Sequence, residues 1–151
     1  MTLASLKQPV IESSQYATFY VGDLLLGLPI HLVQEINRHL DVTSVPHAPN
    51  YVRGVINLRG EVVTVVNLAA ILGLPVDGAT CDSRNVIIHW HDQLIGLVVD
   101  QIADIQSIPP DKILPSPSNV RGVEGRFFKG VYVMDGEIIV LLSIQEALAV
   151  N

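Results

Sequence analysis

Two histidines, His89 and His91, have the spacing that comes nearest to a metal site. On an extended strand, residues i and i+2 face the same side with Cα atoms roughly 6.5–7 Å apart, which suits two ligands of one ion. A closed zinc site needs four ligands, and no third or fourth candidate is spaced convincingly around this pair. We therefore expect no bound metal, and a small metal- or ligand-binding β-barrel protein is the alternative function that this pair leaves open.

The other groups that could carry out catalysis form no recognisable pattern. The single cysteine, Cys81, lies in a polar stretch expected to be a loop, where an unreactive thiol is the ordinary interpretation. Asp100 and Asp104 follow a predicted strand and belong to no cluster of acids. The chain has neither GxxxxGK[ST] nor GxGxxG for phosphate binding, and no Gly-x-Ser-x-Gly nucleophile motif. The sequence predicts no catalytic residue, no cofactor and no enzymatic activity.

Arg59 has a position that folding alone does not explain. It precedes Gly60 between two apolar segments, where a tight hairpin turn is expected. In a related segment later in the chain, the same place is taken by Asp135-Gly136, a dipeptide that favours such turns. Arginine does not favour the turn, but its guanidinium makes bidentate contacts and is enriched at protein–protein hot spots. Arg59 is therefore predicted to form a recognition tip, with a solvated loop arginine as the alternative.

An internal duplication positions these residues. Segment 52–72 matches segment 128–148 at an offset of 76 residues, and segment 23–30 matches segment 92–99 at an offset of 69. Such self-similarity indicates two copies of one structural unit. The predicted organisation is a flexible N-terminal arm over 1–14, a first barrel unit over about 15–76, a linker over about 77–83 and a second barrel unit over about 84–149.

Each copy contains the signals of two β-hairpins followed by one short helix. About five short strands with Val and Ile on both faces must curl or pair with another sheet to remove their edges. This predicts two small barrels that share a core; spacing does not show whether the N-terminal strand stays in its own barrel. The hairpins are expected at 16–30, 52–67, 85–100 and 131–142, and the helices at 68–72 and 144–148. The expected cores consist of Leu26, Leu28, Ile56, Val63 and Val65 in one barrel, and Ile95, Leu97, Val133, Ile139 and Leu141 in the other.

The composition excludes several classes of protein and partner. With 151 residues, 49% hydrophobic and 16% charged, the chain is predicted to be one globular domain. An aromatic content of 5% and a net charge of −6 argue against a nucleic-acid partner. One cysteine excludes an internal disulfide and favours a reducing compartment. Without a signal sequence or a long apolar run, we expect a cytoplasmic protein with no direct membrane insertion.

Three segments together resemble the CheW domain of bacterial chemotaxis coupling proteins. They are 27–36, 52–63 with its Asn57-Leu58-Arg59-Gly60, and 96–102, and the resemblance extends from about residue 15 to 149. It implies an all-β fold with a few short helices, built as two tandem five-stranded SH3-like barrels. It also implies an adaptor that couples chemoreceptors to a CheA-type histidine kinase. Its partners would be the regulatory domain of that kinase and the cytoplasmic tip of a receptor, so the adaptor would be recruited to membrane receptor arrays.

Carried over by position, the resemblance also implies a receptor-binding groove. Its residues would be Val33, Glu35, Ile36, Gly54, Asn57, Leu58, Arg59, Val99 and Ile102. The family often has Asp followed by Leu-Arg after the second hairpin, whereas this chain has Asn67-Leu68-Ala69, and Ser143 in the second copy. These departures put a salt bridge there in doubt and are compatible with a divergent pathway, such as one controlling twitching or gliding. A relative that binds only the kinase is a further alternative, against which the intact Arg59 argues.

Overall fold

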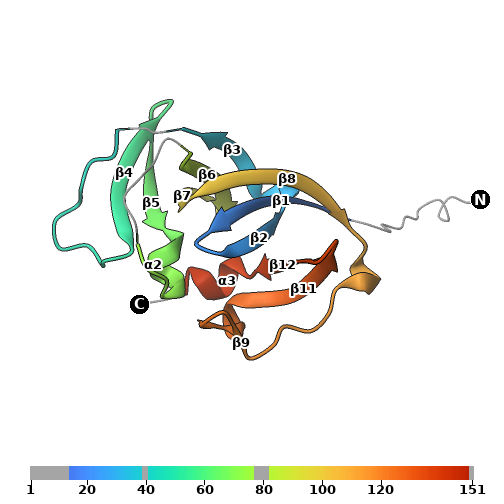
Figure 1. Ribbon diagram of the computed structural model, residues 1–151. Helices are drawn as coiled ribbons and strands as arrows, with labels where there is room; N and C mark the ends of the chain where they lie inside the picture. Colours follow the sequence, from blue (N-terminus) through green and yellow to red (C-terminus); the bar gives the residue numbers. More distant parts are fainter. Residues whose placement is uncertain (1–13, 39–40, 77–81, 150–151) are drawn as a thin grey trace, which may run out of the picture.

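The computed structural model describes residues 14–38, 41–76 and 82–149 (Figure 1). The expected N-terminal arm, apart from its last residue, lies outside these ranges, as do Cys81 and most of the expected linker. The all-β prediction is confirmed, because most of the described chain forms two five-stranded sheets with a few short helices.

We call the two sheets barrel I and barrel II. In spatial order, barrel I consists of β3 (Val33–Asn37), β6 (Arg84–Trp90), β7 (Gln93–Val99), β5 (Glu61–Asn67) and β4 (Val52–Leu58). Barrel II consists of β11 (Phe128–Met134), β12 (Glu137–Leu142), β2 (Leu24–Pro29), β1 (Ser14–Val21) and β8 (Gln101–Ile108). The remaining elements are a ribbon of β9 (Asn119–Val120) and β10 (Val123–Glu124), the helices α2 (Leu68–Leu72) and α3 (Ile144–Ala147), and the 3₁₀ turns η1 (Ile30–Leu32), η2 (Pro110–Lys112) and η3 (Gly125–Phe127).

The four predicted hairpins and both predicted helices are present, but the copies exchange their hairpins. The hairpin β1–β2 from the first copy joins barrel II, where β2 pairs in parallel with β12. The hairpin β6–β7 from the second copy joins barrel I, where β7 pairs in parallel with β5. The units 15–76 and 84–149 are therefore not one barrel each, because every barrel takes strands from both. The exchange covers one edge of each hairpin with a strand of the other copy, which removes unpaired backbone groups.

The exchange also changes which residues share a core. Leu26 and Leu28 of barrel II and Leu97 of barrel I meet in one large cluster between the barrels. Along β2 the side chains alternate, so Leu25 instead joins a small cluster inside barrel II. Because both faces of β2 are buried, its sequence is continuously apolar. A third cluster, inside barrel I, contains Ile56, Val63, Val65 and Ile87.

The predicted core lists are therefore wrong in two respects. The predicted partners Leu26 and Ile56 belong to different clusters, because the shared core takes one face of each sheet. Val133 is not in a core at all and is 53% exposed. It faces outward on β11, opposite Ile138 of β12, which is also half exposed. The shared core nevertheless confirms that the two barrels form one packed unit.

The two short helices close the shared core. Figure 1 shows α2 and α3 next to each other between the sheets, and buried side chains from both helices belong to the large cluster. Within the described ranges, no helix is long and apolar enough to cross a membrane.

Candidate functional site

The turn between β4 and β5 has the backbone of a type I′ hairpin. Arg59 has a φ of 53° and Gly60 a φ of 86°, so both central residues are left-handed, as this turn requires. The Asn57 side-chain oxygen accepts a hydrogen bond from the backbone N–H of Gly60 at 2.9 Å. Asn57 therefore supplies the local support that Arg59 does not, since Asn side chains hydrogen-bond readily to the backbone of a turn.

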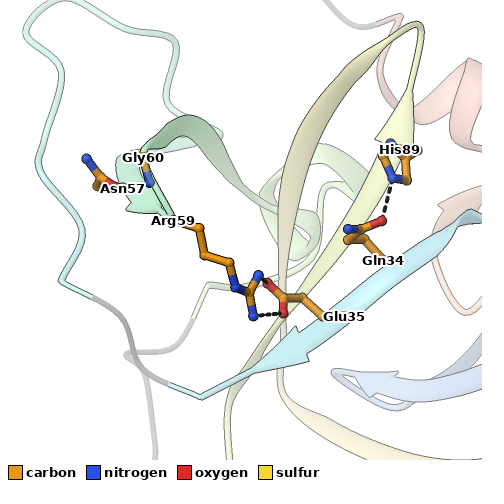
Figure 2. Close-up of polar contacts among 6 residues, drawn as sticks. All are labelled: Gln34, Glu35, Asn57, Arg59, Gly60 and His89. Atoms are coloured by element: carbon orange, nitrogen blue, oxygen red, sulfur yellow. Dashed lines mark hydrogen bonds and ion pairs between the residues drawn. The ribbon is translucent and has the colours of Figure 1, made fainter.

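The Arg59 side chain forms a bidentate ion pair with Glu35 of β3. Figure 2 shows the guanidinium extending from the turn to the carboxylate, with Nη1 2.7 Å from Oε2 and Nη2 2.7 Å from Oε1. The Arg59 side chain is 71% exposed and that of Glu35 is 20% exposed. The sequence placed both residues in one site but did not predict their pairing. The guanidinium stays largely solvated, but two parallel hydrogen bonds fix its plane, and its role as a recognition tip stays a prediction.

The ion pair changes the protonation equilibria of both groups. The hydrogen bond from Arg59 is the main cause that lowers the pKa of the Glu35 carboxyl below its ordinary value, and a hydrogen bond from Asn37 acts in the same direction. The Glu35 carboxylate raises the pKa of Arg59 above its already high value. Both groups are therefore charged at neutral pH. The site presents a fixed cation and anion next to each other on the surface.

The ion pair joins the two outer strands of barrel I. β3 and β4 are at opposite ends of the sheet order, and Arg59 spans the space between them. The chain after β3 also reaches β4, because Thr43 and Val55 exchange two backbone hydrogen bonds of 2.8 and 2.9 Å. The ion pair therefore lies where the barrel closes.

Gly54, predicted in the groove, has a structural role. Its φ is +146°, and a Cβ at this position would lie 2.1 Å from the Thr43 carbonyl oxygen. Its repeat equivalent Gly130 is under a similar constraint, since a Cβ there would lie 2.7 Å from the Leu114 carbonyl oxygen. Leu114 in turn pairs with Val131 as Thr43 pairs with Val55. Gly54 is buried, so it shapes the strand and offers no surface to a partner.

The other predicted site residues divide into exposed and inward-facing groups. Asn57 is exposed and Ile36 is 40% exposed, whereas Val99 is fully buried. The structure does not bring the β7–β8 junction to the turn: Thr64 is opposite Ile95, so the turn lies near the start of β7 and Val99 at its end. The half-buried residues that pack on a core are Val33, Ile102 and Leu58.

An exposed apolar residue on an outer strand of barrel II is not among the predicted site residues. Ile105 of β8 is 58% exposed, more than any of the predicted apolar site residues. It follows Ile36 by the same offset of 69 residues that relates the two copies. The repeat could therefore have identified Ile105 as the equivalent of Ile36, because the two residues occupy equivalent outer strands, β8 and β3, of the two barrels.

The departures from the family pattern cap the two short helices. The Asn67 side-chain oxygen accepts a hydrogen bond from the Ala70 N–H at 3.2 Å, and the Ser143 hydroxyl accepts one from the Glu146 N–H at 3.3 Å. Asn and Ser are among the preferred N-cap residues, so no charged residue is needed for helix initiation there.

The histidine pair has a different geometry from the one expected. β6 ends at Trp90, so His91 lies in the turn with a φ of 50° and packs its ring edge-on against Trp90. The His89 ring instead contacts the side-chain oxygen of Gln34, which precedes Glu35 on β3 (Figure 2). Among the residues described by the structure, no three His, Cys, Asp or Glu side chains are grouped to hold a metal. Nothing in this geometry favours metal ligation.

The fold is thus two interleaved β-barrels around one core, and the candidate site is an exposed ion pair on a hairpin. The CheW-like domain family matches residues 15–150. The chemotaxis protein CheW of Rhizobium meliloti is 35% identical over 126 residues, 83% of this chain and 81% of that protein. The probable chemotaxis protein CheW of Rhizobium etli is 32% identical over 127 residues, 84% of this chain and 82% of that protein.

A solved structure shows the same arrangement. The crystal structure of the scaffolding protein TtCheW from Thermoanaerobacter tengcongensis matches with a TM-score of 0.85 and 28% identity. The match covers 92% of this chain and 94% of that chain. This chain belongs to the CheW-like family, and it is an adaptor of a chemotaxis-type signalling pathway.

Proposed function

We propose that this adaptor binds the cytoplasmic tip of a chemoreceptor at the Glu35–Arg59 pair and couples it to the regulatory domain of a CheA-type kinase. The role of such an adaptor is to join these two proteins without catalysing a reaction. The observation that carries the proposal is the exposed bidentate ion pair, to which Asn57 and Ile36 add a polar and an apolar neighbour. We place this function in the cytoplasm at receptor arrays, because that is where the receptor tip lies.

The ion pair prepares Arg59 for a partner. A guanidinium has five N–H donors, and Glu35 takes two of them, so the others can reach carbonyl or carboxylate oxygens of a docked protein. Glu35 also holds the side chain in one orientation before binding, which reduces the conformational entropy lost in the complex. A preorganised, exposed arginine with unused donors is the kind of residue that dominates protein–protein interfaces.

The test measures the affinity for a receptor tip fragment together with a melting curve. Arg59→Ala should weaken receptor binding about tenfold, as expected for a hot-spot arginine, and change the melting temperature little. Arg59→Lys should restore binding only in part, because lysine lacks the planar fork. Arg53→Ala is the matched control, since Arg53 is an exposed arginine of the same hairpin without an ion pair among the described residues.

Unchanged receptor affinity with a lowered melting temperature in Arg59→Ala would show that the pair is structural. The same titrations also test the kinase-only alternative. A wild-type protein that binds the kinase regulatory domain but not the receptor tip would be a kinase-only relative, and the proposal would be wrong.

A further inference from the structure

A second turn in the molecule repeats the Asn-x-Arg-Gly sequence of the Arg59 turn. It is formed by 119–122 and joins β9 to β10. The Asn119 side-chain oxygen accepts a hydrogen bond from the Gly122 N–H at 2.9 Å, and Arg121 and Gly122 have φ angles of 48° and 91°. The Arg59 turn has the same hydrogen bond at 2.9 Å and nearly the same angles. Both turns therefore present an arginine side chain from the same backbone conformation.

The recurrence does not come from the duplication. At the offset of 76 residues, the equivalent of Asn57 is Val133, whereas Asn119 lies in the connection before β11. Arginine has also taken a left-handed position twice, although residues with a Cβ are uncommon there. Turn formation alone would favour Asn, Asp or Gly at this position, so the arginine side chain requires a separate explanation.

The two arginines differ in their neighbours. Arg59 gives both terminal nitrogens to Glu35, whereas Arg121 makes no hydrogen bond or ion pair with any residue that the structure describes. The Arg121 side chain is exposed. The whole planar fork of the Arg121 guanidinium is therefore available to a partner. Such a fork binds a carboxylate through two parallel hydrogen bonds.

A small open pocket lies beside Arg121. Its volume is about 150 Å³, too small for a drug-sized ligand, which needs roughly 300–1,000 Å³. The pocket has an aliphatic wall and one cation, Arg121, together with two acids: Glu137, which accepts a hydrogen bond from the Tyr20 hydroxyl at 3.2 Å, and Asp23. The wall is formed by Leu24, Leu25, Val120, Ile138 and Val140.

We propose that Arg121 and this pocket form a second protein-binding site, which takes one carboxylate of a partner on the guanidinium and a neighbouring aliphatic side chain in the pocket. The proposal rests on the proposed function and adds a contact surface to it. Arg59 pairs with Glu35, an acid of the same chain. At Arg121, the acid comes from the partner. It carries a single carboxylate rather than an acidic run, because Asp23 and Glu137 at the pocket repel further negative charge.

The position of the site assigns it to a partner other than the receptor. Figure 1 shows β9 below barrel II, well away from the β4–β5 hairpin in barrel I. Both turns can therefore be occupied at the same time. Since an adaptor must hold two proteins together, the site beside Arg121 contacts the kinase side of the assembly.

The experiment titrates the full chain with the kinase regulatory domain and, separately, with a receptor tip fragment. Arg121→Asn removes the guanidinium but keeps a residue that tolerates positive φ, so the turn is preserved. It should weaken kinase binding at least tenfold and leave receptor affinity unchanged, and Arg121→Lys should have an intermediate effect. Lys129→Asn is the matched control, because Lys129 is an exposed cation of β11 outside the pocket, and it should change neither affinity.

The outcomes separate this site from the proposed function. Equal kinase affinity for the wild type and Arg121→Asn would overturn the site, as would a loss of receptor binding instead of kinase binding. Arg59→Ala without an effect on receptor binding would overturn the proposed receptor surface and leave the Arg121 result standing. A wild-type protein that binds neither partner would overturn both proposals.

Discussion

The hairpins β4–β5 and β11–β12 are copies of one another, and they differ mainly at their tips. Both turns are left-handed at their two central residues, with Arg59-Gly60 in one and Asp135-Gly136 in the other. The aspartate suits the turn, whereas the arginine reaches Glu35 on another strand. The comparison shows that the duplication kept the backbone geometry required by the barrel. The exposed side chains at the tips were free to diverge.

Both hairpins contribute side chains to one shared core. Leu97 is fully buried in the cluster that contains side chains of both barrels. Leu97→Ala should lower the free energy of unfolding by roughly 2–5 kcal/mol, and the protein should still unfold in one transition. Urea denaturation followed by circular dichroism and by Trp90 fluorescence would check this. Separate transitions for the two signals would mean that the barrels fold independently.

A second prediction compares the glycines at the base of the two hairpins. Gly54 combines a positive φ with a Cβ position 2.1 Å from a carbonyl oxygen, whereas Gly130 has only the close approach. The conformation alone should cost Gly54→Ala about 1–3 kcal/mol of folding free energy, and the overlap with Thr43 adds to this cost. Gly54→Ala should therefore destabilise the protein more than Gly130→Ala in parallel thermal melts. The reverse order would show that the backbone constraint is not stronger in the first hairpin.

The smallest expected effect is on the pH dependence of stability. It comes from the Arg59–Glu35 ion pair at the tip of the β4–β5 hairpin. Because Arg59 lowers the pKa of Glu35 in the folded protein, the contribution of the pair is complete above the ordinary carboxyl pKa of about 4.3. It is lost as the pH falls through the lowered pKa. Melting curves of the wild type and Glu35→Gln should differ by a constant small amount above about pH 5 and converge in acid. A difference that stays constant down to the acid limit would contradict the role of Arg59 in holding Glu35 ionised.

Local patterns were sufficient to predict the hairpins and the two short helices. The alternation of apolar residues and the turn dipeptides predicted all four hairpins, and the segments after β5 and β12 predicted both helices. The unusual Arg59 in a tight turn was also visible without a structure, because turn chemistry depends on the residues of the turn itself. The resemblance to the family placed Glu35 in the same site.

Other features depend on contacts between distant residues. The offsets of 76 and 69 residues show that segments are copies, but they do not show which hairpin pairs with which. They also do not show which face of β11 meets the core. Val133 was therefore predicted to be in a core, although its side chain faces solvent.

The sequence by itself determined the local structure of this protein: its strands, turns, short helices and the glycines of its repeat. The tertiary structure alone decided that the hairpins exchange barrels, that Thr43 passes close to Gly54, and that Arg59 pairs with Glu35 while Arg121 forms no ion pair with any described residue. The physical reason is the separation along the chain of the residues that interact. Turn and strand preferences act between neighbours in the chain, whereas an ion pair requires two strands to curve into the same space.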